Sequence, residues 1–139
     1  MSRDLIIIIA ASVLIVLLSG FLVWWRKFRK IKLDTTFYQK SWKDLQRLCR
    51  SKNTWPEAII AADRLLAHAL SKKRYRGRTM GAQLVKAQRL FSDNDAVWYS
   101  HKLRSKLESE TNTKLSQGDV KQALMGTRQA LKDLGALDK

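Results

Sequence analysis

The stretch that decides the architecture is 5-LIIIIAASVLIVLLSGFLVWW-25, and the basic segment 26-RKFRKIK-32 follows it directly. The first stretch is 21 residues long and contains no charged side chain. A helix rises by about 1.5 Å per residue, so a helix of this length covers about 30 Å, the thickness of the hydrocarbon core of a bilayer. We therefore expect Leu5 to Trp25 to form a single transmembrane helix that anchors the protein.

The charges on the two sides of this run predict its orientation. Before it, Arg3 and Asp4 offset one another, whereas five basic side chains follow it within seven residues: Arg26, Lys27, Arg29, Lys30 and Lys32. Cytoplasmic flanks of membrane helices carry an excess of Lys and Arg, and the adjacent Trp24 and Trp25 suit the membrane interface. We expect the N-terminus outside, the C-terminal part in the cytoplasm, and the juxtamembrane cluster against anionic lipid headgroups.

A cleaved signal peptide is the alternative interpretation of the same run. The residues before it are few and basic, and Ser19 and Gly20 are small. The apolar run is too long for a signal peptide, however, and no A-x-A-like cleavage site follows it. We therefore expect residues 1–33 to remain as the membrane anchor.

The rest of the chain has the size and pattern of one helical domain. Of the net charge of +15, residues 1–33 hold six basic and one acidic residue, which leaves +10 for residues 34–139. Apolar residues recur there at helical spacing, and no segment alternates as a strand would. We expect an all-α cytoplasmic domain, an up-and-down bundle of about five helices joined by short connections. The expected helix starts are Asp34 to Thr36, the capping-box pattern Thr54 to Glu57, Thr79, Ser92 to Asp95, and Ser116 with Asp119.

A second basic segment lies inside this domain and forms the candidate binding patch. It runs 72-KKRYRGR-78, and its cations are Lys72, Lys73, Arg74, Arg76 and Arg78. Such a patch attracts anionic lipid, at about 1 kcal/mol per residue near the surface, and it equally attracts nucleic acid. The third interpretation is that the charge serves only solubility and topology. Composition alone leaves these three open.

Residues able to perform catalysis are scarce. The chain has two histidines, His68 and His101, one cysteine, Cys49, and neither HExxH, CxxC nor a glycine-rich phosphate loop. We expect no metal, no cofactor and no intramolecular disulfide. His101 and Arg104, three residues apart on one helix face, are the one pair that is typical of a site.

This pair lies in a segment with a family resemblance. The segment 98-WYSHKLRSKLESE-110 resembles the W-x-A-H-K-x-R-N-x-I-A-H-E segment of small bacterial helical domains that are often membrane-anchored, and 61-AADRLL-66 and 78-RTMGAQL-84 look like that group's A-D-x-L-L and T-x-G-x-x-L segments. The group is itself similar to the HEPN superfamily, in which R-x4-6-H places arginine and histidine for RNA cleavage. Arg104 matches the arginine, but Ser105 stands where asparagine is usual and Ser109 where the histidine belongs.

The missing histidine governs what the resemblance implies. A serine hydroxyl cannot carry protons unaided at neutral pH, and no histidine follows His101. The resemblance therefore implies a HEPN-like bundle without catalysis, at the inner membrane of a bacterial cell. We expect a non-enzymatic interaction module that binds a protein partner or a second copy of itself. The alternatives are an RNA- or DNA-binding domain, a ribonuclease that uses His101 and Arg104, and a purely structural pairing of Arg104 with Asp63 or Glu108.

Overall fold

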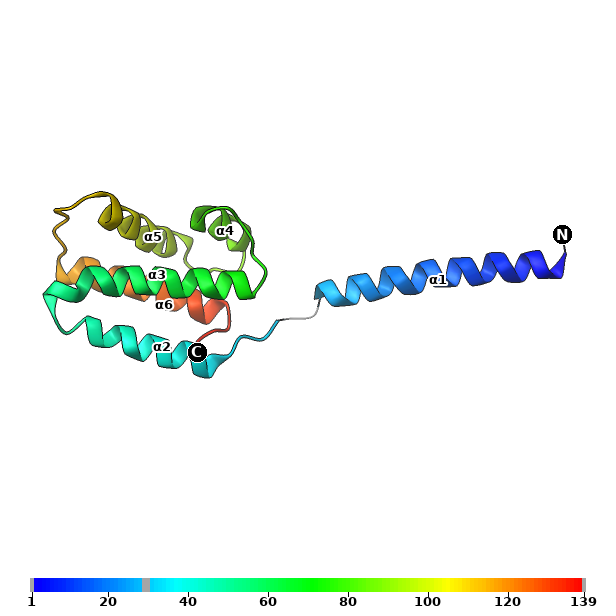
Figure 1. Ribbon diagram of the computed structural model, residues 1–139, viewed down its shortest axis with the longest axis horizontal. Coiled ribbons are helices and arrows are strands. Elements are labelled where there is room, and N and C mark those ends of the chain that lie inside the picture. Colours follow the sequence, from blue (N-terminus) through cyan, green and yellow to red (C-terminus); the bar gives the residue numbers. More distant parts are fainter. Residues whose placement is uncertain (1, 29–30, 139) are drawn as a thin grey trace. The chain divides into compact units, whose positions relative to one another are not determined.

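The computed structural model describes residues 2–28 and 31–138, and within these ranges the chain is helical, without β-strands (Figure 1). The chain divides into two compact units, residues 1–31 and residues 32–139. The expected all-helical class is thus confirmed for the part of the chain that is described. The elements are α1 (Arg3–Phe28), α2 (Thr35–Leu48), the short 3-10 helix η1 (Lys52–Thr54), α3 (Trp55–Lys72), α4 (Met80–Ala87), α5 (Asn94–Ser109) and α6 (Gln117–Asp133).

Helix α1 makes up most of the first unit. The side chains from Leu5 to Trp25 are exposed, and the helix is long and apolar enough to cross a membrane, a property that signal sequences near an N-terminus share. The hydroxyls of Ser12 and Ser19 donate to the carbonyls of Ile9 and Val16, at 2.8 and 2.9 Å. These bonds satisfy the two hydroxyls within the helix, so neither would lie unpaired in lipid.

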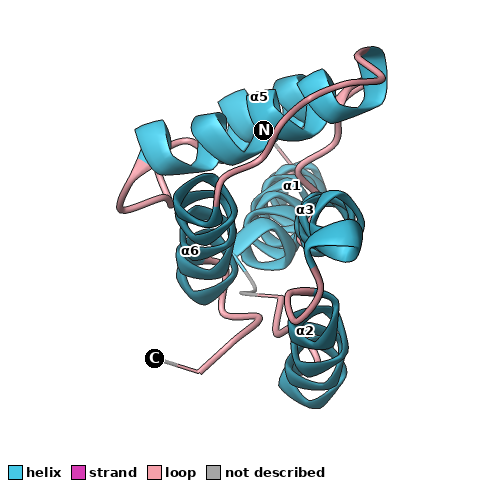
Figure 2. Ribbon diagram, turned by 90° about the vertical axis from the view of Figure 1, so that its left-hand side faces the viewer, coloured by secondary structure: helices cyan, strands magenta, loops and turns pink. Residues whose placement is uncertain are grey.

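Helix α3 is central to the second unit. It contacts α2, α4, α5 and α6, and Ala58, Ile59, Ala62, Ala69 and Leu70 on it are fully buried. Figure 2 looks nearly along the axes of α2, α3 and α6, whereas α5 lies across this direction. At α5 the arrangement therefore differs from the strictly up-and-down one expected from the short connections.

Close packing between α5 and α6 explains how the crossing helix is held. A Cβ added at Gly126 would lie 2.5 Å from the carbonyl oxygen of Ala96, so only glycine permits this approach of the two backbones. Near it, the buried hydroxyls of Ser100 and Thr127 form a 2.7 Å hydrogen bond. Two hydrophobic clusters complete the unit, a large one around α3 and a smaller one around Ile59, Val120 and Ala123.

All five helix starts that the sequence predicts are present, and at four of them the expected side chain caps the helix. Asp34, Thr79, Asp93 and Ser116 each accept a backbone N–H in the first turn of their helix, and Ser116 forms a full capping box with Asp119. The capping box expected at Thr54 to Glu57 is wrong. The hydroxyl of Thr54 donates backward, to the carbonyls of Leu48 and Ser51, because η1 brings these oxygens within reach.

Two helices end in the same hydrogen-bonded motif with different residues at its critical position. After α6, Gly135 has φ +80°, and the N–H groups of Gly135 and Ala136 bond to the carbonyls of Lys132 and Leu131. After α3, the N–H groups of Arg74 and Tyr75 bond likewise to Ser71 and Leu70, and Arg74 takes φ +65°. This left-handed conformation favours glycine, so Arg74 is held there at a cost in backbone strain.

Candidate functional site

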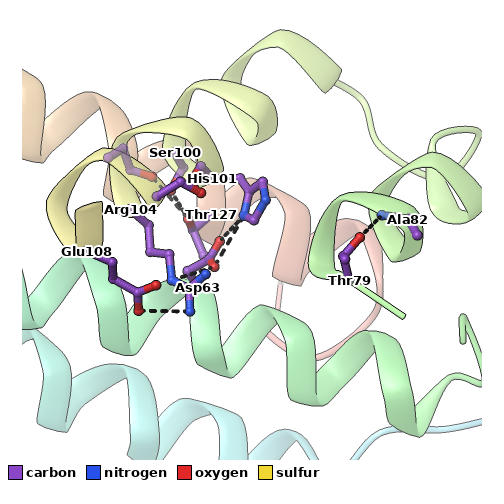
Figure 3. Close-up of polar contacts among 10 residues, drawn as sticks. Asp63, Thr79, Ala82, Ser100, His101, Arg104, Glu108 and Thr127 are labelled. Atoms are coloured by element: carbon purple, nitrogen blue, oxygen red, sulfur yellow. Dashed lines mark hydrogen bonds and ion pairs between the residues drawn. The ribbon is translucent and has the colours of Figure 1, made fainter. Parts of the chain in front are cut away.

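The residues singled out by the family resemblance lie at the contact of α3 with α5 (Figure 3). His101, Arg104 and Glu108 share one face of α5 because they are three and four residues apart. Asp63 faces them from α3 and is only 3% exposed. Asp63, His101, Arg104 and Glu108 are called here the charged cluster.

Within the charged cluster Asp63 is the common partner of His101 and Arg104. Its carboxylate lies 3.3 Å from Nδ1 of His101 and 3.5 Å from Nε of Arg104. The second contact is an ion pair without a well-aligned hydrogen bond, because the buried Nε of Arg104 meets no acceptor at good angles. On its other side Arg104 reaches the Glu108 carboxylate at 2.9 Å. Both pairings that the sequence suggested for Arg104 are therefore present.

This arrangement limits what Arg104 can do chemically. A guanidinium recognises phosphate through its positive charge and its fork of donors. Here two carboxylates already offset that charge, and the side chain is 30% exposed. An anionic substrate would have to compete with both carboxylates, one of them buried.

The two serines of the motif point to local partners. Ser105 donates to the carbonyl of His101, one turn earlier on α5, at 3.1 Å. Ser109 is exposed at the last residue of α5 and donates to the carbonyl of Lys106 at 3.3 Å. Both hydroxyls bond backbone carbonyls through these contacts, so neither bonds a side chain of the charged cluster or a partner that would remove its proton. His101 packs edge-on against the ring of Trp98, with 5.9 Å between ring centroids.

The remaining titratable residues form no further chemical centre in the ranges described. Within residues 2–28 and 31–138 no group of three or more His, Cys, Asp and Glu side chains is arranged to hold a metal ion. Exposed His68 bonds the Tyr38 hydroxyl at 2.9 Å. Cys49 is a free, half-buried thiol, and burial raises its pKa, so it stays protonated at neutral pH.

The second basic segment forms an exposed arm between α3 and α4. Of its cations, Lys72, Arg74, Arg76 and Arg78 are exposed and Lys73 is half-buried. The arm is fixed at its centre, where Tyr75 packs on the large hydrophobic cluster and its carbonyl accepts a 3.0 Å hydrogen bond from the Gln83 amide. Residues 72–78 are called the basic arm below.

The juxtamembrane cluster is only partly within the described structure. Arg26, near the end of α1, and Lys32 are exposed. Of Lys27 only the helical backbone is described, and Arg29 and Lys30 lie outside the described residues.

Two basic features lie outside the segments that the sequence predicted as binding patches. Residues 64–92 contain eight basic and no acidic residues, and this span adds exposed Lys86 and Arg89 of α4 to the basic arm. Counting the basic residues over the whole of residues 64–92, and not only within the turn after α3, would have revealed this extension. The other is an open hollow of about 320 Å³ where Lys102, Lys106 and Lys114 surround Asp119.

Among the residues that line this hollow, only Asp119 carries a carboxylate. Hydrogen bonds from Ser116 and from the Tyr99 hydroxyl, together with the charge of Lys106, hold the pKa of Asp119 below its ordinary value. For Tyr99 the direction is opposite, because partial burial, and then the bond to Asp119, raise the pKa of its hydroxyl.

Comparison with protein-family models, with curated proteins and with solved structures finds no match.

Proposed function

We propose that this protein is a non-enzymatic, single-pass membrane protein whose basic helical unit is an interaction module at the inner surface of a bacterial cell membrane. In this proposal α1 spans the membrane with its N-terminus outside. The helical unit is a HEPN-like bundle that lacks catalysis and meets its partner on the cytoplasmic side. The positive flank of α1 and the net charge of +10 on residues 34–139 support this placement.

The observation that carries the proposal is the pairing of Arg104. RNA cleavage through the 2′-hydroxyl needs a free cation at the phosphate and a group near neutral pKa that moves a proton. Asp63 and Glu108 both pair with Arg104, and Ser109 bonds its own helix. The charged cluster accordingly acts as a link between α3 and α5, and the interaction surface lies elsewhere on the unit.

A cleavage assay tests the non-enzymatic part. Purified full-length protein in detergent is incubated with labelled single-stranded RNA, beside the variants Arg104→Ala and His101→Ala. We expect the three proteins to give the same background. Cleavage by the native protein that either substitution abolishes would refute the proposal, because it would place the charged cluster at a working active site.

A pull-down tests the interaction module and identifies the class of partner. Tagged full-length protein is cross-linked in cells, solubilised and recovered with and without nuclease treatment. We expect a defined protein partner, or a second copy of the chain, that survives nuclease. Recovery that nuclease abolishes would instead assign the unit to RNA or DNA binding, and loss of all cross-links would contradict an interaction module.

A further inference from the structure

One end of the helical unit combines cations with exposed apolar side chains. Beyond α1, the large apolar side chains that are exposed in the described residues are Phe37, Val85, Leu90 and Met125. Val85 and Leu90 are 52% and 41% exposed, on α4 and in the turn after it, and they flank exposed Lys86 and Arg89. Apolar residues interleaved with cations, rather than with carboxylates, are typical of helices that lie in a membrane interface.

This end is also where the chain enters the unit. The Tyr38 hydroxyl bonds His68, so the first turn of α2 lies beside the last turns of α3. Asp34 precedes Tyr38 by four residues and Lys72 follows His68 by four, so along two helices of opposite direction both lie one turn, about 5 Å, toward the same end. Figure 1 shows the start of α2, the end of α3 and α4 together at this end.

The covalent chain limits how far this end can be from the anchor. Six residues, 29–34, separate the last residue of α1 from the first of α2. Even fully extended they span no more than about 25 Å, counting about 3.5 Å for each of the seven steps. The attraction of a cation to an anionic leaflet acts within about one Debye length, roughly 8–10 Å at physiological salt, so docking requires the basic end to approach the leaflet more closely than the full reach of the tether.

Packing leaves the outer face of α4 without a protein partner in the described structure. Leu84 and Ala87 of α4 are buried against the large cluster, and α3 is the helix that α4 packs on. Gln83 of α4 bonds the Ser71 hydroxyl at the end of α3 and the Tyr75 carbonyl in the basic arm, at 3.0 Å each. The basic arm and α4 therefore form one surface. Residues 71–90, which make up this surface, contain seven basic residues and no acidic residue.

We propose that this surface, the basic arm with α4, docks on the anionic leaflet of the same membrane that holds α1, with Val85 and Leu90 entering the headgroup region. The proposal rests on the membrane anchoring in the proposed function and adds the lipid partner of the basic arm. Docking orients the helical unit, so that α6 and its open hollow at Cys49, Trp55 and Lys121 stay accessible to a protein in the cytoplasm.

The test places a probe on each side of the unit in the full-length protein. In a Cys49→Ala background, which removes the single cysteine, Val85→Cys and the control Met125→Cys are labelled with an environment-sensitive fluorophore. Met125 is 60% exposed on α6, so both positions accept the label without disturbing the core. Each protein is reconstituted in phosphatidylcholine vesicles with and without phosphatidylglycerol, and quenching by aqueous iodide and by spin-labelled lipid is measured.

We expect the label at position 85 to be quenched several-fold less by iodide, and more by spin-labelled lipid, when phosphatidylglycerol is present. The label at position 125 should not change, and 1 M salt should reverse the effect, because it shortens the Debye length to about 3 Å. Lys86→Glu with Arg89→Glu should abolish the protection, whereas the matched pair Lys43→Glu with Lys52→Glu, exposed in α2 and in η1, should not.

Equal iodide quenching at positions 85 and 125 in both lipid mixtures would overturn the proposal. Protection of position 85 by added RNA in uncharged vesicles, without protection by phosphatidylglycerol, would also overturn it and assign the surface to nucleic acid. Either result leaves the anchor intact if the protein stays in the membrane after carbonate washing. Failure of the proposed function is thus distinguishable from failure of docking.

Discussion

Replacing Asp63 by asparagine tests whether the charged cluster links α3 to α5. The substitution keeps the shape of the side chain and removes the charge that faces His101 and Arg104. Losing one partner of a fully buried ion pair costs about 3–5 kcal/mol. Arg104 keeps its ion pair with Glu108 at 2.9 Å and is 30% exposed, so its charge retains a partner and contact with water. We therefore expect a smaller loss, about 2 kcal/mol, in the free energy of unfolding.

The measurement is urea unfolding of residues 32–139, which contain both hydrophobic clusters, followed by helical circular dichroism. Glu108→Gln is the matched control, because it removes the other carboxylate beside Arg104 from a side chain that is 44% exposed. An exposed pair contributes less than about 1 kcal/mol. The reasoning would be refuted if Asp63→Asn cost no more than Glu108→Gln, since burial would then not decide the energetics of the cluster.

Three further predictions concern the backbone and the acid range. Arg74→Gly should raise the free energy of unfolding by about 1 kcal/mol in the same assay, because glycine adopts φ +65° without strain; a loss would show that the side chain, not the backbone, dominates there. Gly126→Ala should lower it by about 2 kcal/mol, since the new Cβ would press on the Ala96 carbonyl. Gly118→Ala, whose Cβ would meet nothing closer than 3.6 Å, should cost nothing, and equal losses would contradict the close approach. The lowered pKa of Asp119 contributes stability that is present above its ordinary value of 3.8 and is lost as the pH falls through the folded value. Urea unfolding at several pH values should therefore show Asp119→Asn less stable than the native protein at pH 7 and the difference closing in acid; a constant difference would contradict the assignment.

Helix positions were predictable because the signals for them are local. Apolar spacing placed the buried face of α3, and the caps at Asp34, Thr79 and Ser116 follow from side chains that bond a backbone only three residues away. The start of α3 after Thr54 was predicted correctly, but the capping hydrogen bond expected of Thr54 is absent for a non-local reason. Its hydroxyl found the carbonyl of Leu48, six residues back, because η1 folds the connection onto the end of α2.

The ion pairs of Arg104 were predictable from the sequence, but the surface that the basic arm forms with α4 was not. Arg104 and Glu108 are one turn apart, so their ion pair follows from helix geometry, and burial of Asp63 on the facing helix fits a charge that needs a partner. The crossing of α5 over α6 depends on the absence of a side chain at Gly126, which no periodicity records. The junction of the basic arm with α4 likewise depends on Gln83.

The most direct test of the central claim is the topology of the full-length chain in a bacterial membrane. A protease-sensitive tag is added after residue 139, and protease is applied to intact spheroplasts and to inverted membrane vesicles before and after carbonate washing. We predict that the chain stays in the carbonate-washed membrane and that the tag is cut only in inverted vesicles. Release of the chain by carbonate, or cleavage of the tag in intact spheroplasts, would contradict an anchor that holds the helical unit in the cytoplasm.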